Sequence, residues 1–150
     1  MKHVTLLFLL KEGHILLAMK KRSHGQGKWN GVGGKLDEGE TPEQAAVREC
    51  QEEIEVTPKH LKKVGELHFF DQPDTEHYCH IYTAAEWDGE PSETEEMRPE
   101  WFNVDEIPYD TMWPDDRFWL PKMLAGKTFT GTVVISPDDK ILRCDIQETN

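Results

Sequence analysis

Three glutamates at helical spacing are the residues of this sequence whose types and positions first indicate chemistry. Glu49, Glu52 and Glu53 stand at i, i+3 and i+4, so on a helix their carboxylates are neighbours. Oxygen donors without a thiol or imidazole partner favour a hard cation such as Mg²⁺ or Mn²⁺ over Zn²⁺. Mg²⁺ binds through a few carboxylates and substrate phosphates, so the stretch predicts half of a metal–phosphate site. For the glutamates alone, a solvated acidic helix face is the alternative.

The helix that must carry these glutamates has a well-marked start. Thr41 is a good N-cap, Gln44 three residues later completes a capping box, and Pro42 occupies the first helical position. The apolar side of the same helix consists of Ala46, Val47, Cys50 and Ile54. The helix is therefore expected to pack on a core and to leave its carboxylates on another side.

The stretch 34–56 resembles the Nudix box, G-x5-E-x7-R-E-U-x-E-E-x-G-U, in which U is an aliphatic residue. The matching residues are Gly34, Glu40, Arg48, Glu49, Glu52, Glu53 and Val56. Two positions depart from the pattern, since Cys50 stands at an aliphatic position and Glu55 replaces the late glycine. A residue with a Cβ pays about 1–2 kcal/mol to adopt the left-handed conformation. We therefore expect this helix to end in a different way.

Segments outside the box resemble one branch of the Nudix family, the oxidised purine nucleoside triphosphatases of the mammalian type. These segments are 19–22, 29–31, 33–35, 38–41, 96–99, 101–102 and 112–116. The resemblance implies an α/β Nudix fold, a mixed β-sheet sandwiched between α-helices, in a single domain over residues 1–150. It also implies hydrolysis, with Mg²⁺ or Mn²⁺, of 8-oxo-dGTP, and of other oxidised purine nucleotides such as 2-hydroxy-dATP, to the monophosphate and pyrophosphate.

Carried over by position, the resemblance assigns roles to individual residues. It implies a divalent-metal site made by Gly33, Glu49, Glu52, Glu53 and Glu96. Arg48 resembles the residue that orients the glutamates, and Glu53, with Glu52 next, is the candidate base. The candidate substrate-binding residues are Thr5, Lys20, Asn30, Gly34, Lys35, Phe69, Trp113, Asp115 and Asp116. His24 stands where that branch carries an aromatic residue over the base.

The chemistry of the candidate base site is consistent with an oxidised purine. Oxidation at C8 turns N7 of guanine from an acceptor into a donor. Asp115 and Asp116 can supply an acceptor and, if one is protonated, a donor, because close carboxylates in an apolar site hold a proton. Asn30 offers a donor and an acceptor, and Trp113 a stacking face. For the two aspartates, an N-cap pair before the second helix is the alternative.

The composition of the whole chain limits its partners. A net charge of −12 over 150 residues argues against a nucleic-acid polymer, but it is compatible with a small phosphorylated ligand bound through metal ions. The cysteines Cys50, Cys79 and Cys144 show no paired spacing, which suits a reducing cytoplasm. The apolar run 4–10 is too short to span a membrane. We expect a cytoplasmic monomer with no membrane partner.

Other segments predict the surrounding elements. Strands are expected at 4–10, 15–19, 64–70, 78–85, 100–102, 128–135 and 141–146, and 29–34 is expected to be a short strand that opens into a tight loop. The first two strands and the last two are expected to form hairpins, with a turn at 71–74 and a second helix at 117–124. The basic triplet 20–22 is either a solubility feature or, at Lys20, a phosphate contact. His77 and His80 flank Cys79, and with no second cluster of ligands a structural role in packing is favoured over a soft-metal site.

Two other functions remain as alternatives. One is a Nudix hydrolase of ADP-ribose, dinucleoside polyphosphates or ordinary nucleotides, and the other is a non-catalytic nucleotide-binding module.

Overall fold

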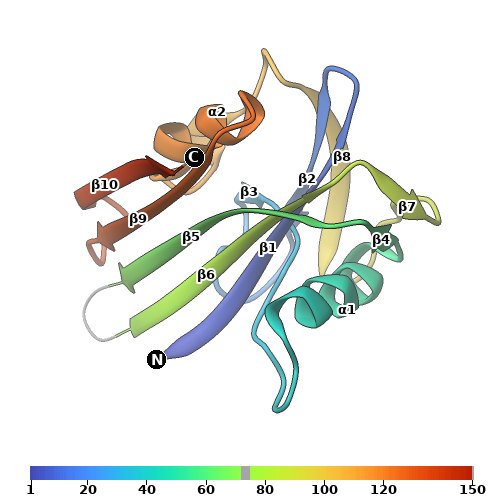
Figure 1. The fold of residues 1–150 in the computed structure, drawn as a ribbon, viewed down its shortest axis with the longest axis horizontal. Coiled ribbons are helices and arrows are strands. Elements are labelled where there is room, and N and C mark those ends of the chain that lie inside the picture. The colour runs from blue at the N-terminus through green and yellow to red at the C-terminus, as the bar shows by residue number, and fades with distance from the viewer. Residues whose placement is uncertain (72–74, 150) are drawn as a thin grey trace.

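The structure is a computed structural model that describes residues 1–71 and 75–149 (Figure 1). Its strands are β1 (Lys2–Lys11), β2 (His14–Lys20), β3 (Trp29–Asn30), β4 (Thr57–Lys59), β5 (Lys62–Asp71), β6 (Thr75–Ala84), β7 (Glu86–Asp88), β8 (Met97–Asn103), β9 (Thr128–Ile135) and β10 (Ile141–Thr149). Its helices are α1 (Pro42–Ile54), the short 3-10 helix η1 (Tyr109–Thr111) and α2 (Asp116–Leu124). Most of the turn predicted at 71–74 lies outside the described residues. Across the described ranges, no helix is both long and apolar enough to cross a membrane.

The main sheet is mixed, as predicted. Its strand order is β10-β9-β5-β6-β1-β2-β3, and β8 pairs with β2. β1 runs parallel to β6 and β5 parallel to β9, whereas the other neighbours in this sheet are antiparallel. The strands β4 and β7, which the sequence did not predict, form a separate two-stranded sheet.

The predicted hairpin of β1 and β2 forms, but the two strands separate directly after their turn. They pair only at Leu10 with Ile15 and at Lys11 with His14. The chain after β3 occupies the gap, because Val32 forms an isolated bridge with Leu7 and Lys35 forms one with Val4. This separation places the glycine loop 31–34 directly beside β1, at the start of the candidate site.

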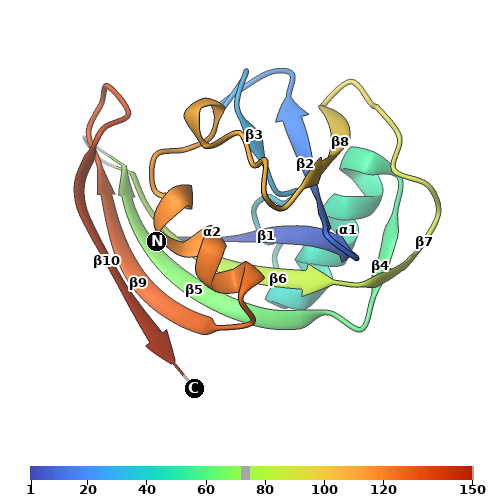
Figure 2. The same ribbon diagram turned by 90° about the horizontal axis from the view of Figure 1, so that it is seen from above.

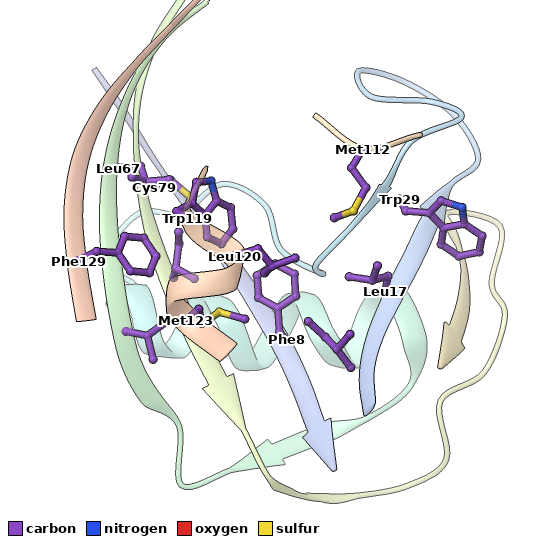
Figure 3. Close-up of a cluster of buried hydrophobic side chains, with 13 residues drawn as sticks. Phe8, Leu17, Trp29, Leu67, Cys79, Met112, Trp119, Leu120, Met123 and Phe129 are labelled. Carbon is purple, nitrogen blue, oxygen red and sulfur yellow. The ribbon is translucent and has the colours of Figure 1, made fainter. Parts of the chain in front are cut away.

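The core lies on both faces of the sheet, because β1 buries alternate side chains in opposite directions. Phe8 packs in a cluster with Trp119 of α2, whereas Leu7 and Leu9 pack in a cluster with Cys50 of α1. A strand that is buried on both faces reads as a continuous apolar run, as residues 4–10 do. Figure 2 shows the two helices against the sheet, and Figure 3 shows the α2 cluster around Phe8 and Trp119. The predicted sandwich is therefore confirmed.

Helix α1 begins as predicted and ends differently from the expectation. The Thr41 hydroxyl accepts from the Gln44 N–H at 3.2 Å, and the Gln44 side chain accepts from the Thr41 N–H at 2.9 Å. At the other end Glu55 adopts the left-handed conformation, with φ 63° and ψ 35°, and donates its N–H to Gln51. The prediction that Glu55 would avoid this conformation is wrong. The chain must turn sharply here because buried Val56 and strand β4 follow at once.

Candidate active site

The glycine loop brings backbone groups into direct contact with the carboxylates of α1. The N–H of Gly33 donates to Oε1 of Glu53 at 2.9 Å. A Cβ at Gly33 would lie 1.8 Å from the carbonyl oxygen of Thr5, and one at Gly34 would lie 2.7 Å from the Glu49 carboxylate. Both glycines are therefore required for the close approach of β1, the loop and α1.

Arg48 holds several groups of this site together. Its guanidinium donates to Glu40 at 2.8 Å, to Glu49 at 2.8 Å and to Glu52 at 3.1 Å. It also donates to the carbonyl oxygen of Lys35 at 3.0 Å, so the contact of Lys35 here is made by its backbone. The hydrogen bond from Arg48 lowers the pKa of Glu40. The guanidinium thus joins three parts of the site: the backbone just after the glycine loop, Glu40 before the helix, and the glutamates of α1.

We expect Arg48→Ala to lower the free energy of unfolding by about 2–3 kcal/mol, because several charge-assisted hydrogen bonds are lost at a half-buried position. Chemical denaturation at pH 7 would measure the change. Arg117→Ala is the matched control: it removes an exposed ion pair with Asp110 and should cost no more than about 0.5 kcal/mol. Equal losses in the two variants would contradict the proposed organising role of Arg48.

Two of the predicted metal ligands have restricted contact with solvent, since Glu53 is buried and Glu49 is half-buried. Burial raises the pKa of Glu53 to about 8, against the opposing effect of the hydrogen bond from Gly33. Burial also raises the pKa of Glu49, although Arg48 partly offsets this. Carboxylates that lose hydration in this way are stabilised in their charged form by a nearby cation. The all-oxygen donor set and its burial therefore fit a hard divalent ion at Glu49, Glu53 and the backbone of Gly33.

Glu52 and Glu96 lie apart from this pair. The Glu52 side chain is 60% exposed and is bound to Arg48, and Glu96 accepts from Nε of Arg22 at 3.0 Å. Among residues 1–71 and 75–149, no three acidic, histidine or cysteine side chains stand together as a ready set of metal ligands. Of the five predicted metal-site residues, Gly33 and Glu53 are therefore in direct contact, Glu49 and Glu52 accept from Arg48, and Glu96 accepts from Arg22.

A cavity of about 190 Å³ begins at the glycine loop and ends at α2. Eight of the predicted substrate-binding residues line it: Thr5, Lys20, Asn30, Gly34, Phe69, Trp113, Asp115 and Asp116. Lys35 is absent from this lining. The sequence analysis missed Lys28, Asp71, His77, Cys79 and Met97, which also line the cavity. These residues come from different strands and loops and form no motif, so no local pattern marks them.

The histidines next to Cys79 have separate surroundings. Cys79 is buried and belongs to the α2 core cluster, and His77 on the same face reaches the cavity. His80 contacts His3 at 3.0 Å and Lys63 at 3.0 Å. Alternation along β6 therefore puts His77 and His80 on opposite faces of the sheet.

Asp115 and Asp116 form the far end of the cavity. They are 1% and 3% exposed. Nε1 of Trp119 donates to Oδ2 of Asp115 at 2.7 Å. Within the described part of the chain, Oδ1 of Asp115 and Oδ2 of Asp116 have no hydrogen-bond partner. Asp115 occupies the N-cap position of α2, as the alternative predicted, but its side chain makes no capping hydrogen bond.

Burial controls the charge of this pair. It raises the pKa of Asp115 to about 6. Burial raises the pKa of Asp116 well above its ordinary value, and the charge of Asp115 adds to this effect. Near neutral pH the pair can therefore hold a proton and offer both a donor and an acceptor to a bound molecule.

We expect Asp116→Asn to stabilise the protein at pH 7 by about 1–3 kcal/mol and to give no comparable gain at pH 4. The folded protein keeps the protons of this pair to higher pH than the unfolded chain does. The pair's contribution to stability is therefore complete below the ordinary Asp pKa of 3.8 and falls as the pH rises through about 6. Thermal melting from pH 4 to pH 8 would test this. The exposed Asp110→Asn variant should show no such pH-dependent difference, and a flat difference for Asp116→Asn would contradict the assignment.

The comparisons with known proteins agree with this architecture. The model of the NUDIX domain matches residues 1–123. The chain is 45% identical over 148 residues to an oxidized purine nucleoside triphosphate hydrolase from Danio rerio, covering 98% of this chain and 95% of that protein. It is 43% identical over 148 residues to the protein of the same name from Mus musculus, covering 97% of this chain and 94% of the mouse protein.

Solved structures include a neighbour over nearly the whole chain. The crystal structure of a MutT protein from Bacillus halodurans superposes with a TM-score of 0.87 at 26% identity, covering 98% of each chain. The domain match extends from β1 into α2 and so includes the glycine loop, the box helix and the aspartate pair. The chain belongs to the Nudix family of hydrolases.

Proposed function

We propose that this protein, as one hydrolase domain over residues 1–150, converts oxidised purine nucleoside triphosphates to monophosphates and pyrophosphate, with 8-oxo-dGTP as the leading substrate and 2-hydroxy-dATP as a second. The observation that carries the proposal is the buried aspartate pair, which has two oxygens without a partner among the described residues. The pair lines a cavity that extends to Gly33, and the N–H of Gly33 donates to Glu53 of α1. The relatives named oxidized purine nucleoside triphosphate hydrolase support the same substrate class.

The cavity offers the groups that such a base requires. An ionised carboxylate of the pair accepts from N7–H, which guanine acquires on oxidation at C8, and unmodified guanine has no proton there. A protonated carboxyl donates to a carbonyl oxygen of the base. Asn30 lines the cavity, and its side-chain oxygen accepts from the Gly31 N–H at 2.8 Å, so its amide nitrogen supplies the donors for the base. Trp113 supplies a stacking surface.

The other end of the cavity carries the proposed chemistry. Nudix hydrolases act with a divalent metal, and we take Mg²⁺ as the ion here. Glu49, Glu53 and Gly33 would hold it, with Glu52 and Glu96 added once their carboxylates leave Arg48 and Arg22. The ion supplies charge neutralisation for the triphosphate and activation of water.

The chain's own groups complete this proposed step. Lys20 lines the cavity near Glu53, whose pKa its charge lowers, and is placed to bind a phosphate oxygen. Glu53 takes the proton as water attacks a phosphorus of the triphosphate chain. The bond from that phosphorus to the oxygen that bridges the α and β phosphorus atoms breaks, and the monophosphate and pyrophosphate separate.

A parallel assay tests the proposal. Pyrophosphate release is measured with Mg²⁺ from 8-oxo-dGTP, 2-hydroxy-dATP and dGTP, and AMP release is measured from ADP-ribose. We expect kcat/KM for 8-oxo-dGTP to exceed that for dGTP, and chelation of the metal to abolish release. Equal turnover of dGTP, or preferred turnover of ADP-ribose, would contradict the substrate assignment. No hydrolysis of any of them would favour the non-catalytic alternative.

A further inference from the structure

One of the residues that line the base cavity is an exposed histidine, His24. His24 lies in the loop 23–27, and its ring centroid is 5.0 Å from that of Trp113, at an interplanar angle of 36°. Gly25 of the same loop lies against the Trp113 indole, since a Cβ there would be in ordinary contact at 3.5 Å. His24 and Trp113 therefore form adjacent parts of the wall that a purine would contact.

This imidazole needs an external group to hold its position. The His24 side chain is 72% exposed, so most of its surface is free of packing neighbours. An exposed side chain retains rotamer freedom, and the conformational entropy lost when a ligand orders that side chain opposes binding. The loop itself closes through backbone hydrogen bonds, from Gln26 to Ser23 at 3.1 Å and from Lys28 to Gly25 at 3.0 Å. These bonds position the backbone of the loop and leave the imidazole free to rotate.

Asp71 is the group that contacts this ring. It is the last residue of β5, its side chain is 18% exposed, and Oδ2 lies 3.5 Å from Nε2 of His24. Asp71 lines the cavity together with the half-buried His77, and its charge opposes the lowering of the His77 pKa by burial. His77 in turn stacks on Phe69, with ring centroids 5.2 Å apart. Asp71, His24 and His77 therefore all belong to the wall of the cavity.

Building on the proposed function, we propose that Asp71 is a positioning residue for substrate specificity: it holds the His24 imidazole beside Trp113, where the ring forms the wall that packs on the oxidised purine. Asp71 acts through His24 and contributes to binding of the base. The phosphate chemistry, at the opposite end of the cavity, does not depend on it.

This proposal predicts an energetic coupling between the two residues. Asp71→Ala should raise KM for 8-oxo-dGTP about fivefold, a typical value for an aromatic contact, and leave kcat within about twofold. Asp71→Asn retains an acceptor oxygen for the imidazole N–H and should recover most of the loss. In a His24→Phe background, a phenyl ring stacks without needing a carboxylate partner. There Asp71→Ala should change KM by less than about twofold.

The experiment is a double-mutant cycle with two readouts. Steady-state hydrolysis of 8-oxo-dGTP gives KM and kcat, and calorimetric titration with the product 8-oxo-dGMP gives an affinity that does not depend on turnover. Asp88→Ala, which removes a Lys59 ion pair on the remote β4–β7 sheet, is the matched control and should leave both values unchanged.

The outcomes separate this inference from the proposed function. A KM increase for Asp71→Ala that is the same with His24 and with Phe at position 24 would overturn the positioning role, as would an unchanged KM with His24 present. If the wild type does not hydrolyse 8-oxo-dGTP, the proposed function fails. In that case coupling in the 8-oxo-dGMP titrations would still support the role of Asp71, and its absence would overturn that role too.

Discussion

Glu53→Gln is expected to lower kcat for 8-oxo-dGTP at least about 100-fold, the scale of losing one main electrostatic contribution to a transition state. The glutamine keeps an oxygen for the Gly33 N–H, which Glu53 binds at 2.9 Å, so the loop should retain its position. An amide also needs no hydration of a charge at this buried site, so folding should be unaffected or slightly favoured. Pyrophosphate release, together with nucleotide titration and thermal melting, measures the three effects separately.

The control for this variant lies on the same helix. Glu43 is in the first turn of α1 and is exposed, so Glu43→Gln should change kcat by less than about twofold. Near-wild-type turnover in Glu53→Gln would remove Glu53 from the proposed catalytic role. A variant that loses nucleotide binding as well as turnover would instead indicate that Glu53 shapes the glycine loop.

Asp116→Ala is expected to reduce the preference for 8-oxo-dGTP over dGTP by about 10- to 100-fold, the range for a lost hydrogen bond that involves a charged group. Its carboxylate is 3% exposed, and one of its oxygens has no partner within the described ranges. Oxidised guanine offers a proton at N7 and normal guanine does not, so a pair reduced to one carboxyl group should lose more affinity for the oxidised substrate than for dGTP. The measurement is the ratio of kcat/KM values for the two nucleotides.

Asp116 is a cleaner choice for this test than Asp115. Alanine at position 115 would leave the indole N–H of Trp119 buried without the acceptor that it contacts at 2.7 Å, which would confuse a binding defect with a folding defect. The exposed Asp110→Ala variant is the matched control and should keep the wild-type ratio. An unchanged ratio in Asp116→Ala would mean that the base is recognised by other residues.

The two ends of the candidate site differ in how far the sequence predicted them. The capping box of α1 and the neighbouring carboxylates of Glu49 and Glu53 follow from spacing along one helix. The need for glycine at position 34, a box position, was likewise visible. The burial of Asp115 and Asp116 was only one of two alternatives, because an N-cap pair has the same sequence pattern.

The sequence by itself determined the elements that form through contacts between residues close along the chain. These are the box helix with its neighbouring glutamates and the two hairpins. The tertiary structure alone decided that β1 and β2 separate, that Glu96 accepts from Arg22, and that Asp71 reaches His24. It also decided that Glu55 accepts a strained conformation so that Val56 can be buried. Helix caps and i, i+4 neighbours depend on a few consecutive residues, whereas long-range strand pairing and the loss of water around a carboxylate depend on residues from the whole chain.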